Sequence, residues 1–105
     1  MGVLVIAEHD NRVLRPATLN ALTAGSLLGD VSVLIAGEGC SGVAEEAAAL
    51  QGVKRVLLCD DAVYAEALAE PLAELIAGIG TQYSHLLAPA TTFGKNLMRG
   101  ESVFI

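Results

Sequence analysis

Four short aliphatic runs, separated by segments of helical character, constrain the fold of this chain more than any other feature. Each run is continuous rather than alternating, which is the pattern of a strand buried on both faces of a parallel sheet. Strands that alternate with helices favour one sheet with helices on both faces and right-handed crossovers. The sequence therefore predicts a three-layer α/β/α fold with strands over residues 3–7, 31–36, 53–59 and 84–88.

Proline and glycine mark where the predicted helices begin and end. Pro16 suits the first position of a helix that runs to about Leu28, and Gly29-Asp30 ends it. Ser41 is the predicted N-cap of the second helix. The remaining predictions are a short turn over 62–68 and helices over 43–51, 71–79 and 92–98. Helical spacing predicts a core-facing side for the third of these, made by Leu72, Leu75, Ile76 and Ile79.

The 105 residues suffice for one domain, and their charge excludes some functions. The net charge is −6 and the basic residues are scattered, which argues against binding to nucleic acid or to an acidic membrane. No apolar run approaches the roughly 18–20 residues that a membrane span requires. An apolar segment follows Met1-Gly2 directly, without the basic leader of a secretory signal, so we expect a cytoplasmic protein.

Parallel α/β sheets bind ligands beyond the carboxyl ends of their strands, where the strand order reverses. With a Rossmann-like order of 3-2-1-4, the reversal lies between strands one and four, so loops 8–12 and 90–96 should meet there. The second loop opens a predicted helix, whose free N–H groups attract anions. The candidate anion or nucleotide site is Thr91, Thr92, Gly94 and Lys95, with interdomain contact or helix capping as the alternative.

The end of the chain departs from the repeating pattern. Only a short stretch separates the fourth predicted strand from Ser102–Ile105, and a parallel crossover requires about a dozen residues or more. We therefore expect no ordinary fifth parallel strand, and the domain is interpreted as truncated. An exposed apolar edge on the fourth strand would then favour self-association, so a homo-oligomer is predicted.

Two further groups around the strand ends could carry chemistry. Gly37-x-Gly39-x-x-Gly42 formally matches a dinucleotide fingerprint, but it follows the second strand rather than the first, which favours a turn that needs positive φ. Cys40 lies near a helix start, where a thiol pKa can fall, yet an idle packed thiol is the favoured reading. Cys59 is predicted to be a buried strand residue. The two cysteines lack metal-ligand spacing and suit a reduced cytoplasm.

Charged and histidine side chains at the strand ends offer weaker candidates. His9, flanked by Glu8 and Asp10, could act in acid–base chemistry, but a solvated loop end is favoured because no nucleophile accompanies it. His85 is expected to be structural. Asp60-Asp61 could bind a divalent ion, although capping of the following helix is preferred. No complete catalytic set is present, so we expect no enzyme and no metal site.

Five segments, in order, resemble the start of the electron transfer flavoprotein alpha subunit. The resemblance covers about residues 3–97 and implies an N-terminal α/β domain of the adenine nucleotide alpha hydrolase-like type. From Met98 the chain departs from the family pattern, which predicts a domain over 1–97 and an atypical tail over 98–105. The segments are VLVIAEH at 3–9, LRPATLNALTA at 14–24, VLIAGEGCSGVA at 33–44, GVKRVLLCDD at 52–61 and LLAPATTFGKN at 86–96.

The resemblance implies the rest of the functional prediction. In that family FAD is held mostly by a C-terminal domain of the alpha subunit and completed by a beta subunit, which also holds AMP. The complex carries electrons from flavin dehydrogenases to a quinone oxidoreductase. We therefore expect a scaffold and heterodimer-contact domain that itself holds no FAD, with the beta subunit and the C-terminal FAD domain as partners. The alternative is a small AMP- or ATP-binding module that uses the crevice between loops 8–12 and 90–96.

Overall fold

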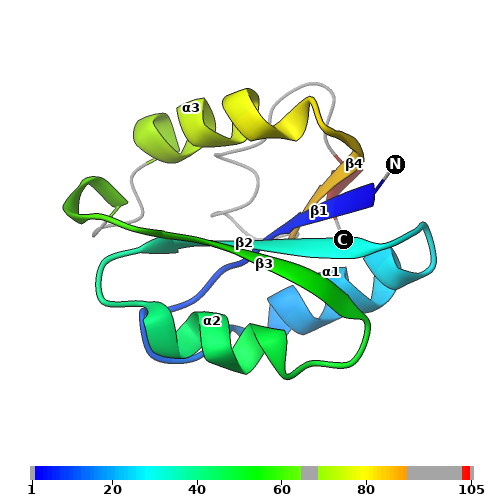
Figure 1. The fold of residues 1–105 in the computed structure, drawn as a ribbon, viewed down its shortest axis with the longest axis horizontal. Coiled ribbons are helices and arrows are strands. Elements are labelled where there is room, and N and C mark those ends of the chain that lie inside the picture. Colours follow the sequence, from blue (N-terminus) through cyan, green and yellow to red (C-terminus); the bar gives the residue numbers. More distant parts are fainter. Residues whose placement is uncertain (1, 65–68, 90–102, 105) are drawn as a thin grey trace.

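The computed structural model describes residues 2–64, 69–89 and 103–104, which form one sheet covered by helices on both faces (Figure 1). All neighbouring strands are parallel, in the order β3-β2-β1-β4-β5. The predicted α/β/α fold and the predicted order 3-2-1-4 are therefore confirmed. The strands are β1 (Gly2–Ile6), β2 (Val31–Gly37), β3 (Val53–Asp60), β4 (Tyr83–Ala88) and β5 (Val103–Phe104).

The described helices divide between the two faces of the sheet. Helices α1 (Pro16–Ser26) and α2 (Ser41–Ala48) cover one face, and α3 (Ala69–Gly80) covers the other (Figure 1). Pro16 occupies the first turn of α1, as predicted. The prediction for Ser41 was wrong, because α2 begins at Ser41 and its N-cap is Cys40, which makes no side-chain cap. The predicted turn at 62–68 is described only as the 3-10 helix η1 (Ala62–Tyr64), and helix 92–98 lies outside the described residues.

The expectation of no fifth parallel strand was wrong. Strand β5 pairs with β4 in parallel, with Val103 beside Leu87 and Phe104 beside Ala88. Residues 89–102 reach the length of about a dozen that a parallel crossover requires. The carboxyl end of β4 is thus paired, and the edge expected to drive self-association is not open at these two residues.

Two hydrophobic clusters, one on each face of the sheet, form the core. Side chains of β1 and β2 alternate between them because successive residues of a strand point to opposite faces. The cluster under α1 and α2 includes Val3, Val5, Val33, Ile35 and Leu87. The cluster under α3 includes Leu4, Ile6, Leu34, Leu72 and Ile76, with Leu75 and Ile79 packed against it. The predicted core-facing side of α3 is therefore confirmed.

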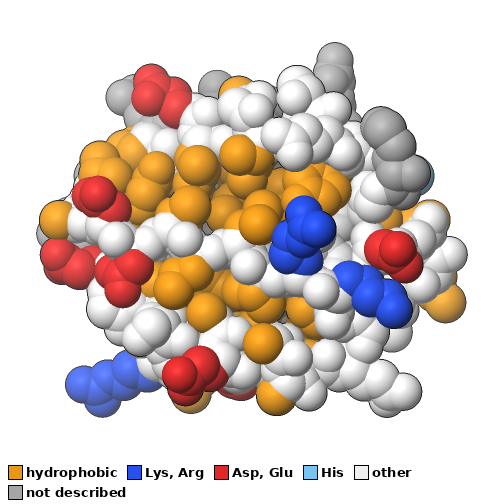
Figure 2. All heavy atoms as spheres, viewed as in Figure 1, with side chains coloured by type: hydrophobic (Ala, Val, Ile, Leu, Met, Phe, Trp, Pro, Cys, Tyr) orange, Lys and Arg blue, Asp and Glu red, His pale blue; other side chains and the backbone are white. Residues whose placement is uncertain are grey.

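Strand β3 differs from the two central strands because it forms an edge of the sheet. Lys54, Arg55 and Leu58 are exposed, although the sequence pattern predicts a strand buried on both faces. Cys59, predicted to be buried, is only partly so. Figure 2 shows hydrophobic side chains gathered on both sides of this edge, toward α3 and toward α2. No helix among the described residues is long and apolar enough to cross a membrane.

Candidate functional site

The candidate site lies where the carboxyl ends of β1, β2 and β3 bring three loops together. These loops contain residues 8–12, 37–40 and 60–61. Hydrogen bonds join the first loop to the end of β2 and the second loop to the third. Strand β1 lies between β2 and β4, so the strand order reverses beside it as predicted. The candidate residues Thr91, Thr92, Gly94 and Lys95 lie outside the described residues. Their role in anion or nucleotide binding stays a prediction.

Both ring nitrogens of His9 are hydrogen-bonded, one within the first loop and the other to the end of β2. Its Nδ1 lies 3.0 Å from the Asn11 backbone nitrogen, and its Nε2 lies 2.9 Å from the Ala36 carbonyl oxygen. A backbone N–H can only donate, so Nδ1 accepts and the proton must be on Nε2. The ring is therefore a neutral structural link. This corrects the preferred expectation of a solvated loop end, and the geometry leaves neither nitrogen free for acid–base chemistry.

The pKa of His9 is lowered from its ordinary value of 6.5, chiefly by burial. Protonation would also place an N–H at Nδ1, facing the N–H of Asn11. The folded pKa of His9 lies below the unfolded value. The contribution of the neutral His9 ring to the free energy of unfolding is therefore complete above pH 6.5 and is lost as the pH falls toward the folded pKa.

We expect the free energy of unfolding to decline as the pH is lowered from about 7.5 to about 5, with His9 as the source. His9→Gln retains an amide that can donate to the Ala36 carbonyl but cannot titrate, so it should flatten this decline. Urea unfolding at several pH values measures the effect, with His85→Gln as the control that leaves His9 intact. Asp10 titrates at lower pH than this range, because backbone N–H groups of Val13 and Arg12 lower its pKa from 3.8. An unchanged slope in His9→Gln would contradict the assignment.

Asn11 and Gly37 fit together at the centre of the three loops. Asn11 has φ of 70°, a left-handed conformation that asparagine adopts more readily than most residues. Its Oδ1 atom is buried and has no hydrogen-bond partner among the described residues. A Cβ atom on Gly37 would collide with that oxygen and would lie 2.9 Å from Cε1 of His9. Gly37 is therefore required for close packing of the first two loops.

Thr18, in the first turn of α1, binds the backbone of Glu8 in the first loop. Its hydroxyl accepts from the Glu8 N–H at 2.8 Å and donates to the Glu8 carbonyl at 3.1 Å. The side chain is fully buried. Sequence reasoning missed this contact, although Thr18 stands inside the LRPATLN segment two residues after Pro16.

Thr18→Val should lower the free energy of unfolding by about 1–3 kcal/mol. Valine matches threonine in shape but leaves the Glu8 N–H without its partner, while the Glu8 carbonyl keeps the Arg15 N–H at 2.9 Å. Chemical denaturation measures the loss. Thr23→Val is the matched control, since Thr23 is exposed and bonds only to its own helix at Leu19 O. Equal losses in the two variants would show that the Glu8 contact is unimportant.

The second and third loops are held by aspartate side chains and a positive-φ glycine. Asp60 Oδ1 accepts from the Gly39 N–H at 2.8 Å, and Gly39 has φ of 66°. Asp61 Oδ1 accepts from the Val63 N–H at 3.0 Å. The preferred expectation for the pair, capping, is confirmed for Asp61, whereas Asp60 joins two loops. Across residues 2–64, 69–89 and 103–104, no three His, Cys, Asp or Glu side chains are grouped as metal ligands would be.

The glycine motif and Cys40 have structural rather than chemical roles here. Gly39 needs its positive φ, as the preferred interpretation predicts. A Cβ on Gly42 would meet nothing within 4 Å, so Gly42 does not supply the close helix–sheet packing of a dinucleotide fingerprint. Burial, the largest cause, raises the pKa of the Cys40 thiol, which therefore stays protonated and packed in the core. Burial likewise raises the pKa of Cys59.

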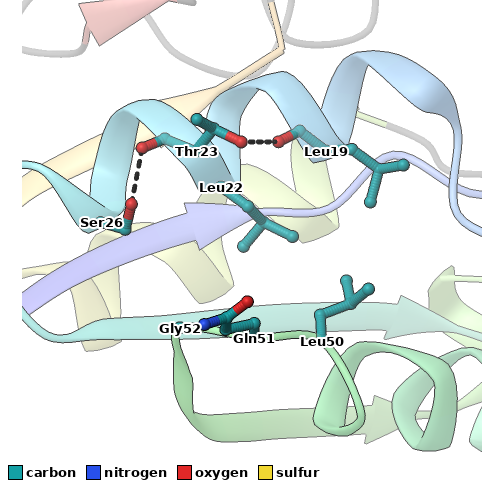
Figure 3. A pocket seen from close by; sticks show the side chains of 7 residues that line it. All are labelled: Leu19, Leu22, Thr23, Ser26, Leu50, Gln51 and Gly52. Carbon is teal, nitrogen blue, oxygen red and sulfur yellow. Dashed lines mark hydrogen bonds between the residues drawn. The ribbon is translucent and has the colours of Figure 1, made fainter.

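A separate groove of about 430 Å³ lies between α1 and the turn that follows α2 (Figure 3). The hydroxyl of Thr23 donates to Leu19 O at 3.1 Å, and that of Ser26 donates to Thr23 O at 2.7 Å. These donors are thus used within α1 and do not converge on the groove. The lining consists of Leu19, Leu22, Thr23, Ser26, Leu50, Gln51 and Gly52.

Comparison with known proteins gives one consistent similarity. A family model described as "Electron transfer flavoprotein domain" matches residues 3–100. Electron transfer flavoprotein subunit alpha of Pseudomonas aeruginosa is 52% identical over 99 residues, covering 93% of this chain and 32% of that protein. The Paracoccus denitrificans subunit is 50% identical over 99 residues, with the same two coverages. The mitochondrial subunit of Dictyostelium discoideum is 39% identical over 104 residues, covering 90% of this chain and 29% of that protein. The chain thus spans about a third of the length of these relatives.

Proposed function

The chain belongs to the electron transfer flavoprotein domain family, and from that premise we propose that it is the N-terminal scaffold domain of an alpha subunit. The observation that carries the proposal is the match over residues 3–100 together with relatives named as alpha subunits. The domain occupies residues 1–97, followed by a tail over 98–105. Pairing of Val103 and Phe104 with β4 attaches that tail to the sheet.

The scaffold makes contact with a beta subunit and with a C-terminal FAD domain, and FAD is held outside this chain. The assembled protein carries electrons from flavin dehydrogenases to a quinone oxidoreductase in the cytoplasm. Support comes from the strand-end loops, where His9, Thr18, Asp60 and Asp61 hold the backbone in place. Hydrogen bonds of this kind keep the loop backbone rigid, which suits a surface for contact with another subunit.

Co-purification with a bacterial electron transfer flavoprotein beta subunit tests this function. A tagged form of the chain should retain the beta subunit, and the chain purified alone should show no flavin absorbance between about 300 and 550 nm, before or after added FAD. Failure to retain the beta subunit would refute the contact role. Stoichiometric FAD on the isolated chain, bleached reversibly by dithionite, would refute the scaffold role.

The arrangement of β1 beside β4 favours a second candidate function, a small nucleotide-binding module. Loop 8–12 follows β1, and residues 90–96 follow β4, so AMP or ATP would bind between them with phosphate on Thr91, Thr92 and Lys95. Calorimetric titration with AMP and ATP tests this candidate. Lys95→Ala should abolish binding, whereas Lys54→Ala, on the exposed edge strand, should not. Equal titrations for Lys95→Ala and the unmodified chain would exclude this function.

A further inference from the structure

The outer edge of β3 has no strand partner among the described residues. The N–H of Asp61 donates to the Gly37 carbonyl at 2.9 Å, which continues the ladder between β3 and β2. In a parallel pair a residue directs its N–H and C=O to the same side, and neighbouring residues alternate. The odd-numbered residues of β3 therefore bond to β2, and the backbone groups of Val56 and Leu58 point outward. An edge of this kind is a template for another strand.

The sequence of this edge is complementary to itself when read in the opposite direction. Lys54 and Arg55 stand at its amino end, and Asp60 and Asp61 follow at its carboxyl end, all four exposed. The residues between them, 56–59, are apolar. Two copies in antiparallel orientation place the basic end of each strand beside the acidic end of the other. Opposite charges across neighbouring strands are stabilising, and like charges, which a parallel arrangement would bring together, are destabilising.

We propose that β3 pairs antiparallel with β3 of a second copy of this chain, about a twofold axis at Leu57. The axis is perpendicular to the sheet, so both copies keep their α3 sides on the same face and each residue meets one of matching orientation. Arg55 of each copy lies diagonally across from Asp61 of the other. The directly opposed residues are Leu57 with Leu57, Val56 with Leu58, and Lys54 with Asp60.

Pairing of two β3 strands covers the apolar surface beside the β3 edge. Leu58 is 43% exposed, and Val56 and Leu57 are only partly buried against the two core clusters. The bands of hydrophobic side chains on both sides of the edge meet the same bands of the second copy (Figure 2). The charged ends select the antiparallel register more than they add affinity. An interface built on one strand from each copy is small, so the dimer is weak and depends on concentration.

Sedimentation velocity or light scattering over a concentration series measures the dimer. The unmodified chain should rise from 10.8 kDa toward twice that mass as its concentration increases to the millimolar range. The double variant Lys54→Glu/Arg55→Glu should remain monomeric, because both ends of the edge are then acidic. The matched control is Arg12→Glu/Arg15→Glu, which makes the same change of charge at exposed residues outside β3 and should still dimerise. A monomeric unmodified chain throughout the series, or equal loss of dimer in both double variants, would overturn the proposal.

A mixture of complementary variants separates the edge contact from any effect on folding. Asp60→Lys/Asp61→Lys should not self-associate, but it should form a heterodimer when mixed with Lys54→Glu/Arg55→Glu. Circular dichroism checks its fold, since Asp60 and Asp61 bond to Gly39 and Val63. No heterodimer between two folded variants would overturn the charge pairing.

A disulfide at the axis tests the register and does not depend on the charge variants. Opposed residues at a position without hydrogen bonds lie about 4.5 Å apart between Cα atoms, a separation that a disulfide accepts. Leu57→Cys, in a Cys59→Ser background, should therefore form a covalent dimer under mild oxidation. Leu27→Cys in the same background, on an exposed turn outside β3, should not. Equal cross-linking of the two variants would overturn the proposed register.

Discussion

Replacing Leu87 with alanine should lower the free energy of unfolding by about 2–5 kcal/mol. Leu87 is fully buried in the cluster under α1, and its strand lies between β1 and β5. Strands on both sides of β4 hold the backbone around Leu87 in place, so the structure can close only part of the cavity left by the missing atoms. A domain of ordinary stability has about 5–15 kcal/mol in total, so this one change removes a large share.

Urea unfolding followed by circular dichroism measures the loss, and Leu27→Ala is the matched control. Leu27 is 84% exposed, so the same chemical change there should alter the free energy of unfolding by less than about 0.5 kcal/mol. A loss at Leu87 no larger than that at Leu27 would show that β4 is not packed into the core as described.

Gly37→Ala should lower the free energy of unfolding by about 1–3 kcal/mol, as overpacking of a dense site does. The added methyl collides with Oδ1 of Asn11 and lies 2.9 Å from Cε1 of His9. Both are loop residues with little room to retreat, because His9 is bonded to Ala36 and to the Asn11 backbone. The His9 ring protons should therefore also shift in an NMR spectrum.

Gly42→Ala provides a control whose expected effect has the opposite sign. A Cβ at Gly42 meets nothing within 4 Å, and the residue lies in α2, where alanine is favoured over glycine by about 0.5–1 kcal/mol. Gly42→Ala should thus be neutral or stabilising. Destabilisation of equal size in both variants would mean that the contact of Gly37 with Asn11 and His9 has no special importance.

The successful predictions came from patterns that are local in the sequence. A continuous aliphatic run such as 31–36 indicates a buried strand wherever it lies, and Pro16 favours a helix start because its φ is already suitable. The strand order and the meeting of loops at the carboxyl ends follow from the rules of parallel sheets. Two of the wrong predictions concern edges of the sheet. The pattern of β3 is that of a central strand, and β5 is too short to be recognised from two residues.

The sequence by itself determined the α/β/α class, the order of its elements and the family, because hydrophobic period, proline position and ordered motifs are properties of neighbouring residues. Only the tertiary structure decided which atoms the polar side chains contact. His9 reaches Ala36, Thr18 reaches Glu8, and Gly37 makes room for Asn11 across separations that no local pattern records. A hydrogen bond or a collision depends on atoms within a few ångströms of one another. Those distances exist only once β1, β2 and the loops after them are placed side by side.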